Sequence, residues 1–339
     1  MKRLYCGMDL HSSNTYIGIL NQDKQRIFKK RVPNDLNLIV QTMEPFRKHL
    51  EGIVIESTFN WYWLVDGLMD GGYKVHLANP ARMQMYKGIK HQDDKRSAFW
   101  LAELLALKVL PEGYIYPKED RPIRDLTRKR GYFVRQRTSN KLSLQSLIER
   151  NTGQHLSGNE IDALQINDLH TLLKRDFIVA AGFAHYNTIL HFNQLICEIE
   201  KKILAVARLQ QPFDLLLTIE GVGKIIALTI MYEVGDIGRF SQAGDFSSYC
   251  RCVPSRKSSN EKSKGEGNKK NGNRYLSWAF AEAAHFAVRH SMRAKKYYER
   301  KKIETNAMVA SRALANKLSR AVFYMLRDKK PFNEEALYC

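Results

Sequence analysis

The chain has 339 residues, 44% of them hydrophobic, which suits two or three domains with a substantial core and excludes a disordered chain. Its 54 Lys and Arg residues outnumber its 35 Asp and Glu residues, which gives a formal charge of +19. A solubilising surface rarely needs such an excess, so we expect a polyanionic partner, nucleic acid in preference to a membrane. No stretch reaches the roughly 18 apolar residues of a membrane span, and no signal-peptide core follows the first residues.

Cysteine usage indicates reduced thiols and a cytoplasmic location, because the five cysteines lack the spacing of a disulfide framework. They are Cys6, Cys197, Cys250, Cys252 and Cys339. Cys250 and Cys252 are one residue too close for the usual zinc-binding pair, and no second pair accompanies them. We therefore expect no zinc site.

The amino-terminal third has the pattern of an α/β layer. Alternating or short apolar runs predict strands over 3–9, 14–20, 25–32, 52–56 and 73–77. Helical spacing of apolar residues predicts helices over 35–50, 60–69 and 94–110. Three strands and a helix, followed by strand–helix–strand–helix, predict one mixed sheet with helices, and this element order is similar to that of RNase H-like nucleases and integrases.

Acidic residues stand at the ends of two of these strands and at the start of a helix. Asp9 ends the first strand, Glu56 ends the fourth, and Asp93 and Asp94 open the helix after the fifth. Several carboxylates at one point provide the oxygen ligands that Mg²⁺, or Mn²⁺ in its place, prefers. Such a site could polarise a scissile phosphate and stabilise its leaving oxygen. Taken one at a time, the same residues could be ordinary surface carboxylates.

A helical connector follows a linker over 117–122. Residues 123–150 predict a long polar helix, and a break near 151–153 separates it from a second helical stretch over about 167–207. Two such helices suggest an antiparallel coiled hairpin, which could also serve for dimerisation. The basic residues of the first helix fit phosphate contacts as well as they fit a solvated face. They include Arg124, Arg128, Lys129, Arg130, Arg135 and Arg137.

A glycine turn lies further along, in the segment 217–225. An apolar residue, then Gly221, Gly223 and Lys224 before a helix, resembles the hairpin of helix–hairpin–helix DNA-binding modules, in which backbone amides face a phosphate. The alternative is a tight turn between two packed helices. A dinucleotide site is disfavoured, because no strand pattern precedes the glycines.

A basic stretch over 255–274 predicts a flexible loop held over a site, because a strongly apolar helix over 275–290 follows it. A last amphipathic helix is expected over 306–326. The carboxy-terminal region is therefore mostly helical. The basic residues that we expect to contact nucleic acid in this stretch are Arg256, Lys257, Lys262, Lys264, Lys269, Lys270 and Arg274.

The motifs resemble those of one family, the DEDD transposases of insertion-sequence family one hundred and ten, in its eleven-eleven subgroup. Its amino-terminal signature is similar to the segments 7–11, 55–58 and 90–102. Its carboxy-terminal signature is similar to the segments 219–223, 259–260, 264–268 and 271–276. The resemblance covers nearly the whole chain, with both halves in order.

The resemblance implies a RuvC-like domain of RNase H fold over 1–118, a helical connector over 119–208 and a carboxy-terminal transposase domain over 209–339. It implies a prokaryotic protein, associated with the nucleoid when bound to DNA. It also implies that a noncoding guide RNA (a bridge RNA) pairs donor and target double-stranded DNA, in a homodimer or homotetramer. By motif position, the resemblance implies that Ser259 is the nucleophile that attacks the DNA phosphate, with Ser258 second. Serine attacks only when a base or a metal activates it.

Two departures from the family pattern bear on activity. Ser97 stands where the family has its fourth acid, and a neutral hydroxyl is a weaker metal ligand than a carboxylate. Asn260 and Glu261 stand where the family often has glycine after the serine. Two other readings therefore stay open: a junction-resolving endonuclease in which water attacks, and a catalytically disabled copy that only binds nucleic acid.

Overall fold

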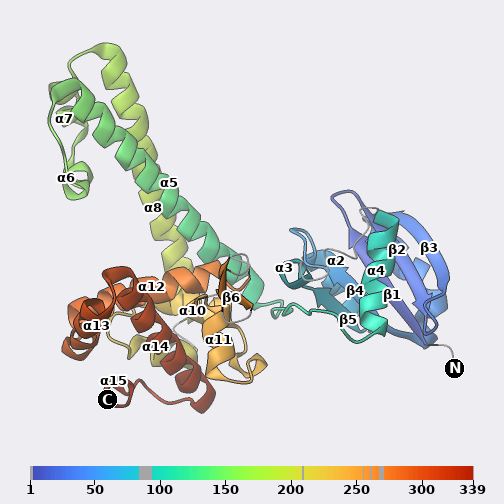
Figure 1. Cartoon of the computed structure of the whole chain (residues 1–339). Helices are drawn as coiled ribbons and strands as arrows, with labels where there is room; N and C mark the ends of the chain where they lie inside the picture. The colour runs from blue at the N-terminus through green and yellow to red at the C-terminus, as the bar shows by residue number, and fades with distance from the viewer. Residues whose placement is uncertain are drawn as a thin grey trace. The chain divides into compact units, whose positions relative to one another are not determined.

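The structure is a computed structural model that describes residues 3–83, 94–207, 210–254, 256–259, 262–266 and 271–338. It divides into two compact units (Figure 1). Residues 1–118 and 256–271 make up the first unit, and residues 119–255 and 272–339 make up the second. None of the described helices is long and apolar enough to cross a membrane.

The first unit is built on a five-stranded mixed sheet in the order β3-β2-β1-β4-β5. β1 pairs antiparallel with β2 and parallel with β4; β2–β3 is antiparallel and β4–β5 is parallel. This sheet and the helical remainder of the chain confirm the predicted fold class. The strands are β1 (Leu4–Leu10), β2 (Asn14–Asn21), β3 (Arg26–Pro33), β4 (Leu50–Glu56) and β5 (Val75–Ala78).

Helices cover both faces of the sheet. On one face, α1 (Leu36–Met43) and α2 (Tyr62–Asp70) pack on alternate apolar residues of β1, β2 and β4. On the other face lies α4 (Asp94–Ala106), whose apolar side chains contact β2 and β4. The short elements η1 (Glu44–His49) and α3 (Pro80–Met83) complete the described part of this layer.

The direction of α4 over the sheet follows from two contacts. A Cβ built on Gly7 would lie 1.9 Å from the Ala98 carbonyl oxygen, and one built on Gly52 would lie 3.2 Å from Leu105. Gly52 is the β4 partner of Tyr5, two residues before Gly7 along β1. The helix is therefore antiparallel to β1, and its first turn lies toward the carboxyl ends of β1 and β4.

The second unit begins with a long antiparallel helical hairpin, as predicted. α5 (Asp120–Thr152) and α8 (Asp176–Ala207) lie side by side. Side-chain contacts join Arg130 to Glu200 and Arg137 to Asn193, so that residue numbers rise on one helix as they fall on the other. At the tip, α6 (Gly158–Ala163) and α7 (Ile166–Leu173) close a separate small core.

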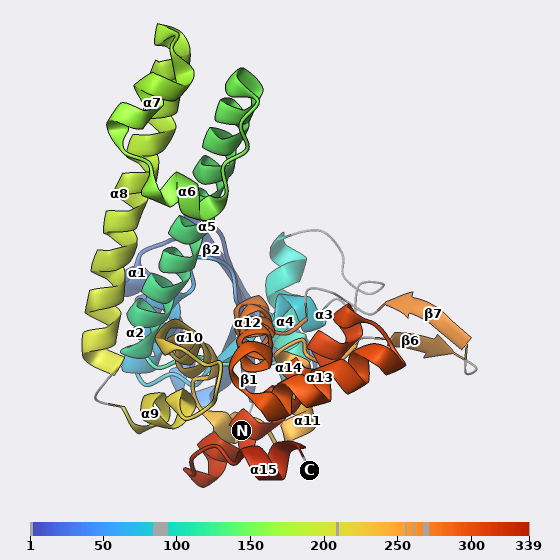
Figure 2. The same ribbon diagram turned by 90° about the vertical axis from the view of Figure 1, so that its left-hand side faces the viewer.

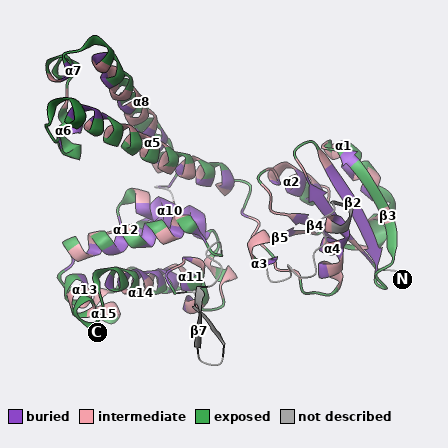
Figure 3. Cartoon of the chain, turned by 45° about the horizontal axis from the view of Figure 1, so that its top comes forward, coloured by how far each residue is buried: buried purple, intermediate pink, exposed green. Residues whose placement is uncertain are grey.

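The rest of this unit is a helical bundle with its own core (Figures 2 and 3). α12 packs against both α10 and α14, and α10 is buried along most of its length, as Figure 3 shows. The helices are α9 (Gln211–Leu217), α10 (Lys224–Val234), η3 (Ile237–Arg239), α11 (Ala243–Tyr249), α12 (Arg274–His290), α13 (Met292–Glu304), α14 (Ala307–Asp328) and α15 (Glu334–Tyr338).

Several element boundaries differ from the predictions. The first helix ends at Met43, because a 3₁₀ helix with Pro45 in its first turn begins at Glu44 and leads into β4. α4 ends at Ala106, where the chain turns through the left-handed backbone of Lys108. The predicted helix over 167–207 is two helices, separated at the left-handed Lys174.

The basic stretch that we predicted as a flexible loop contains two short strands in its described part. β6 (Arg256–Ser259) and β7 (Lys262–Glu266) pair antiparallel, with Ser259 opposite Lys262. The backbone pairing gives the stretch a defined hairpin in place of the expected loop.

Candidate active site

The first two acidic residues are neighbours on the sheet. Met8 of β1 lies opposite Ile55 of β4 in a parallel ladder, so Asp9 and Glu56 come next to one another. Side chains alternate between the two faces of a sheet, and Gly7 and Val54, two residues earlier, face α4. Asp9 and Glu56 therefore leave the sheet on the α4 face, at the carboxyl ends of their strands.

Asp9 is the more enclosed of the two carboxylates. Its residue exposure is 9%, whereas Glu56 is half-buried. The Nε2 atom of His11 lies 3.7 Å from Asp9 Oδ2, so a protonated imidazole would form an ion pair there. A buried carboxylate close to a second one costs free energy unless a cation compensates it.

Asparagine side chains fix the loops that follow these strands. Asn34 and Asn60 both donate to the His11 carbonyl oxygen, at 2.9 and 3.0 Å. Asn34 accepts from Thr15 and Asn60 accepts from Thr58, at 2.8 and 2.9 Å. The loop after β1 is thereby tied to the loop after β4. We did not predict these positioning residues; the only sequence signal is that Asn34 directly follows β3 and that Asn60 lies in the loop after β4.

The first turn of α4 approaches the same edge of the sheet. Asp94 is the first residue of the helix and Ser97 the fourth; Ser97 is half-buried. The backbone thus brings Asp9, Glu56 and Asp94 to one edge, although the side chain of Asp94 lies outside the described residues, as does all of Asp93. Within the described side chains, no group of three His, Cys, Asp or Glu residues could hold a metal ion.

The donor set nevertheless fits a hard divalent cation. Asp9 and Glu56 provide two carboxylates on one face, and a residue at the start of α4 would complete the site. Carboxylate oxygens suit Mg²⁺ and Mn²⁺ rather than soft metals.

The predicted nucleophile lies on the β6–β7 hairpin. Ser259 is the last residue of β6 and Ser258 the one before it; only their backbone is described. Of the basic residues predicted in this stretch, Arg274 is exposed at the start of α12. Burial, together with the charge of Arg274, lowers the pKa of Arg251. Arg256 and Lys257 lie on β6 and Lys262 and Lys264 on β7, while Lys269 and Lys270 lie outside the described residues.

Two arginines predicted to contact phosphate have a partner inside the fold instead. Arg124 Nε lies 3.1 Å from Glu233 Oε2, and Arg128 lies 2.5 and 2.8 Å from the two carboxylate oxygens. Asn273 donates to the same carboxylate at 2.7 Å. Burial alone would raise the pKa of Glu233, but the hydrogen bond from Arg128 and the charges of both arginines hold it below its usual value. This cluster joins α5 to α10 and α12.

The other predicted residues of α5 divide into two groups. Arg130 pairs with Glu200 at 2.8 Å, and Arg137 donates to Asn193 at 2.8 Å. Lys129 and Arg135 are exposed. Of the predicted residues on this helix, those two side chains are therefore the best placed to reach a phosphate.

The glycine turn combines both readings of its sequence. It joins α9 to α10, and Gly221 has a φ of +95°. A Cβ on Gly221 would lie 2.4 Å from the Ala287 nitrogen, so close packing against α12 requires glycine there. Gly223 and Lys224 are exposed at the start of α10, where backbone amides could face an anion.

Comparison with known proteins identifies similar sequences in both halves of the chain. A family model described as a transposase, of the IS110 DEDD type, matches residues 6–151. A second, described as the transposase IS116/IS110/IS902 family, matches residues 213–299. The first match contains Asp9 and Glu56, and the second contains Ser259.

Two curated proteins are similar over part of the chain. The transposase for insertion sequence element IS1111A of Coxiella burnetii is 27% identical over 154 residues, which cover 43% of this chain and 42% of that protein. The uncharacterized 43.6 kDa protein of insertion element IS110 of Streptomyces coelicolor is 29% identical over 153 residues, 44% of this chain and 37% of that protein. The chain thus spans about two fifths of the length of these relatives.

Proposed function

Because transposase family models of the IS110 type match residues in both halves of the chain, we propose that it is a transposase of this kind and that it cleaves and rejoins DNA strands at the edge of the sheet where Asp9 and Glu56 lie. The observation that carries this proposal is the register of β1 and β4, which puts the two carboxylates side by side beneath the first turn of α4. An acidic site in a chain of charge +19 favours chemistry on a phosphodiester.

Asp9, Glu56 and Asp94 are the residues that would hold a divalent cation, Mg²⁺ or Mn²⁺. When bound, the cation would polarise the scissile phosphate and stabilise charge on the leaving oxygen. Asn34 and Asn60 keep the loops after β1 and β4 in place, so that the carboxylates need little rearrangement when the ligands arrive.

Ser259 acts as the nucleophile in this proposal, with Ser258 second. Its Oγ forms a bond to phosphorus as the bond between phosphorus and the sugar oxygen breaks. The hydroxyl proton passes to a base, and the departing sugar oxygen takes up a proton. The product is a phosphoserine link, which attack by another strand's hydroxyl reverses, so strands are exchanged without net hydrolysis.

The partners in this proposal are a guide RNA and donor and target DNA, bound by a homodimer or homotetramer. The region 1–118 carries the acidic site, the connector 119–208 supports assembly, and the region 209–339 brings the serine. The support is the charge of the chain, the long α5–α8 hairpin and the exposed basic residues Lys129, Arg135, Lys224 and Arg274.

The experiment that tests this function is trapping of a covalent protein–DNA adduct, with guide RNA, both DNAs and Mg²⁺. The expected result is an adduct that Ser259→Ala removes and Ser258→Ala leaves. Because Ser97 weakens the metal site, each variant is also made in a Ser97→Asp background. Cleavage without any adduct would contradict the serine mechanism and favour the junction-resolving nuclease in which water attacks.

One observation favours the disabled-copy alternative. Ser97 occupies the fourth position of α4, half-buried, where the family has an acid. No cleavage in either background, with binding of nucleic acid intact, would favour a protein that only binds.

A further inference from the structure

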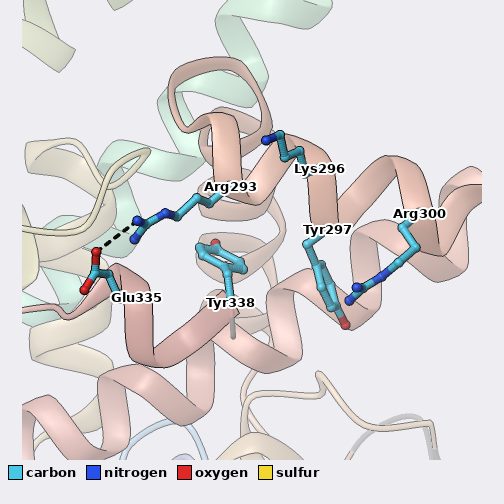
Figure 4. A pocket seen from close by; sticks show the side chains of 6 residues that line it. All are labelled: Arg293, Lys296, Tyr297, Arg300, Glu335 and Tyr338. Carbon is cyan, nitrogen blue, oxygen red and sulfur yellow. Dashed lines mark hydrogen bonds and ion pairs between the residues drawn. The ribbon is translucent and has the colours of Figure 1, made fainter.

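A basic cavity lies in the second unit, outside every motif considered so far. It has a volume of about 510 Å³ and opens between α13 and α15 (Figure 4). Its lining residues are Arg293, Lys296, Tyr297, Arg300, Glu335 and Tyr338. α13 carries six basic residues and two acidic ones within thirteen positions, so the wall that it provides is strongly positive.

Four of the basic residues of α13 form two pairs that differ in their partners. Lys301 pairs with Glu304 at 2.7 Å and Lys302 with Glu299 at 3.4 Å, both along the helix. In the part of the chain that the structure describes, Lys296 and Arg300 have no carboxylate within ion-pair distance. Both are exposed and both line the cavity, so their charges are available to an anion.

Arg293 is paired with carboxylates of α15, Glu335 at 2.9 Å and Glu334 at 3.9 Å. Its guanidinium donates to the Glu335 carboxylate at 2.9 Å, as Figure 4 shows. The exposures of the two side chains are 46% and 75%, and an exposed pair of this kind contributes little stability. A phosphate could therefore compete with Glu335. α15 itself is held by other contacts, from Ser291 to Glu334 and from Lys317 to the Leu337 carbonyl oxygen.

Two tyrosine rings provide an aromatic surface beside these charges. The centroids of Tyr297 and Tyr338 are 6.1 Å apart, and the rings are tilted by 46°. Burial, with the nearby Glu334, Glu220 and Tyr297, raises the pKa of Tyr338, so its phenol stays protonated and can donate. Aromatic faces next to cationic side chains are the usual binding surface for unpaired bases.

We propose that this cavity binds an unpaired nucleotide of a nucleic-acid strand, with its phosphate on Lys296 and Arg300 and its base against the tyrosine rings. The inference rests on the proposed function, which supplies strands with unpaired ends or loops as partners. Both RNA and single-stranded DNA have this chemistry, and a duplex does not, because its bases are stacked and paired.

The test measures binding of the full chain to short single-stranded RNA and DNA and to a duplex of equal length, by fluorescence anisotropy. The test variant is Lys296→Ala with Arg300→Ala. The matched control, Lys301→Ala with Lys302→Ala, removes the same charge from the same helix but from side chains that do not line the cavity. A third variant, Glu335→Gln, removes the carboxylate that competes for Arg293.

The expected result is a loss of roughly tenfold or more in single-strand affinity for the test variant, with duplex affinity nearly unchanged. The dependence of log affinity on log salt should become shallower by about 0.7, because one phosphate of a single strand is no longer neutralised. Glu335→Gln should bind single strands more tightly than the parent chain. Loss with RNA alone, with DNA alone or with both identifies the source of the nucleotide and supports the proposal in each case.

Equal losses in the test and control variants would overturn the proposal, because they would reflect the charge of the helix and not the cavity. Losses of the same size for duplex and single strands would overturn it as well. Tyr338→Leu tests whether the base stacks on the tyrosine rings. This variant should have a lower affinity than the parent chain for a normal oligonucleotide and the same affinity for an abasic one. Equal losses of affinity for both oligonucleotides would exclude stacking. Covalent adduct formation at Ser259 is a separate measurement, so failure here leaves the proposed function standing.

Discussion

Gly7 of β1 lies directly under the Ala98 carbonyl oxygen of α4, and a Cβ on residue 7 would be only 1.9 Å from that oxygen. The same Cβ would be 2.8 Å from the Ala102 nitrogen. α4 thus rests on the backbone of the sheet and not on side chains of β1 at this point. The close approach sets the height of the helix above Asp9 and Glu56.

Gly7→Ala should therefore lower both stability and activity. The clash is with helix backbone, which cannot move aside as a side chain can, so we expect a loss of at least about 2 kcal/mol in the free energy of unfolding. Chemical denaturation measures this loss. Gly113→Ala in the same unit is the control: its Cβ would make ordinary contacts of 3.4 Å or more, so its stability should change by less than about 1 kcal/mol. Equal stabilities for the two variants would contradict this packing.

Glu233 is expected to make stability depend on pH in the acidic range. Its pKa is lowered in the folded chain, so its contribution is complete above the unfolded value of about 4.3 and is lost as pH falls through the folded value. Glu233→Gln, which cannot ionise, should be less stable than the parent chain at pH 7, and the difference should narrow below about pH 4. Thermal denaturation from pH 7 to pH 3 measures both effects.

Removal of the Glu233 side chain is a harsher test of the same cluster. Glu233→Ala leaves Arg124 buried without its carboxylate, which typically costs about 3–5 kcal/mol. The control is Glu149→Gln, an exposed acid on α5 whose change should have almost no effect. For the Glu233→Gln variant described above, a difference in stability from the parent chain that does not change with pH would show that the carboxylate is not held in its charged form.

Lys129 and Arg135 should contribute to nucleic-acid affinity without contributing to stability. Both are exposed on α5, so their joint replacement by alanine should weaken duplex DNA binding and reduce the salt slope by about 1.8. Lys201→Ala with Lys202→Ala, on exposed positions of α8, removes equal charge as a control. Filter binding across a salt series makes the comparison. Identical slopes for the two double variants would assign the binding to net charge and not to α5.

The sequence was sufficient for the strands of the sheet and for the adjacent positions of Asp9 and Glu56. Apolar runs that end in Asp9 and Glu56 predict strands whose ends meet, and the structure has these strands next to each other. The antiparallel α5–α8 hairpin likewise follows from local periodicity. Such features depend on residues close in sequence, whose pattern of apolar and polar side chains predicts strands and helices directly.

Features that depend on distant partners could not be predicted. Arg124 belongs to a long basic run, and only the fold reveals that Glu233, 109 residues away, neutralises it. The α13–α15 cavity requires two segments separated by all of α14. The β6–β7 hairpin was missed because its serines and lysines have weak strand propensity and its backbone pairing carries the structure.

The catalytic role of the carboxylates is tested most directly by recombination between donor and target DNA, with guide RNA and Mg²⁺, for four chains: the parent, Ser97→Asp, and each of these with Asp9→Asn. If the carboxylates at the edge of the sheet perform the chemistry, Ser97→Asp should increase product by restoring an acid to α4. Asp9→Asn should then abolish product in both backgrounds while leaving DNA binding intact. Product that persists in the Asp9→Asn chains would contradict the account, because the reaction would then proceed without the buried carboxylate on which the site is built.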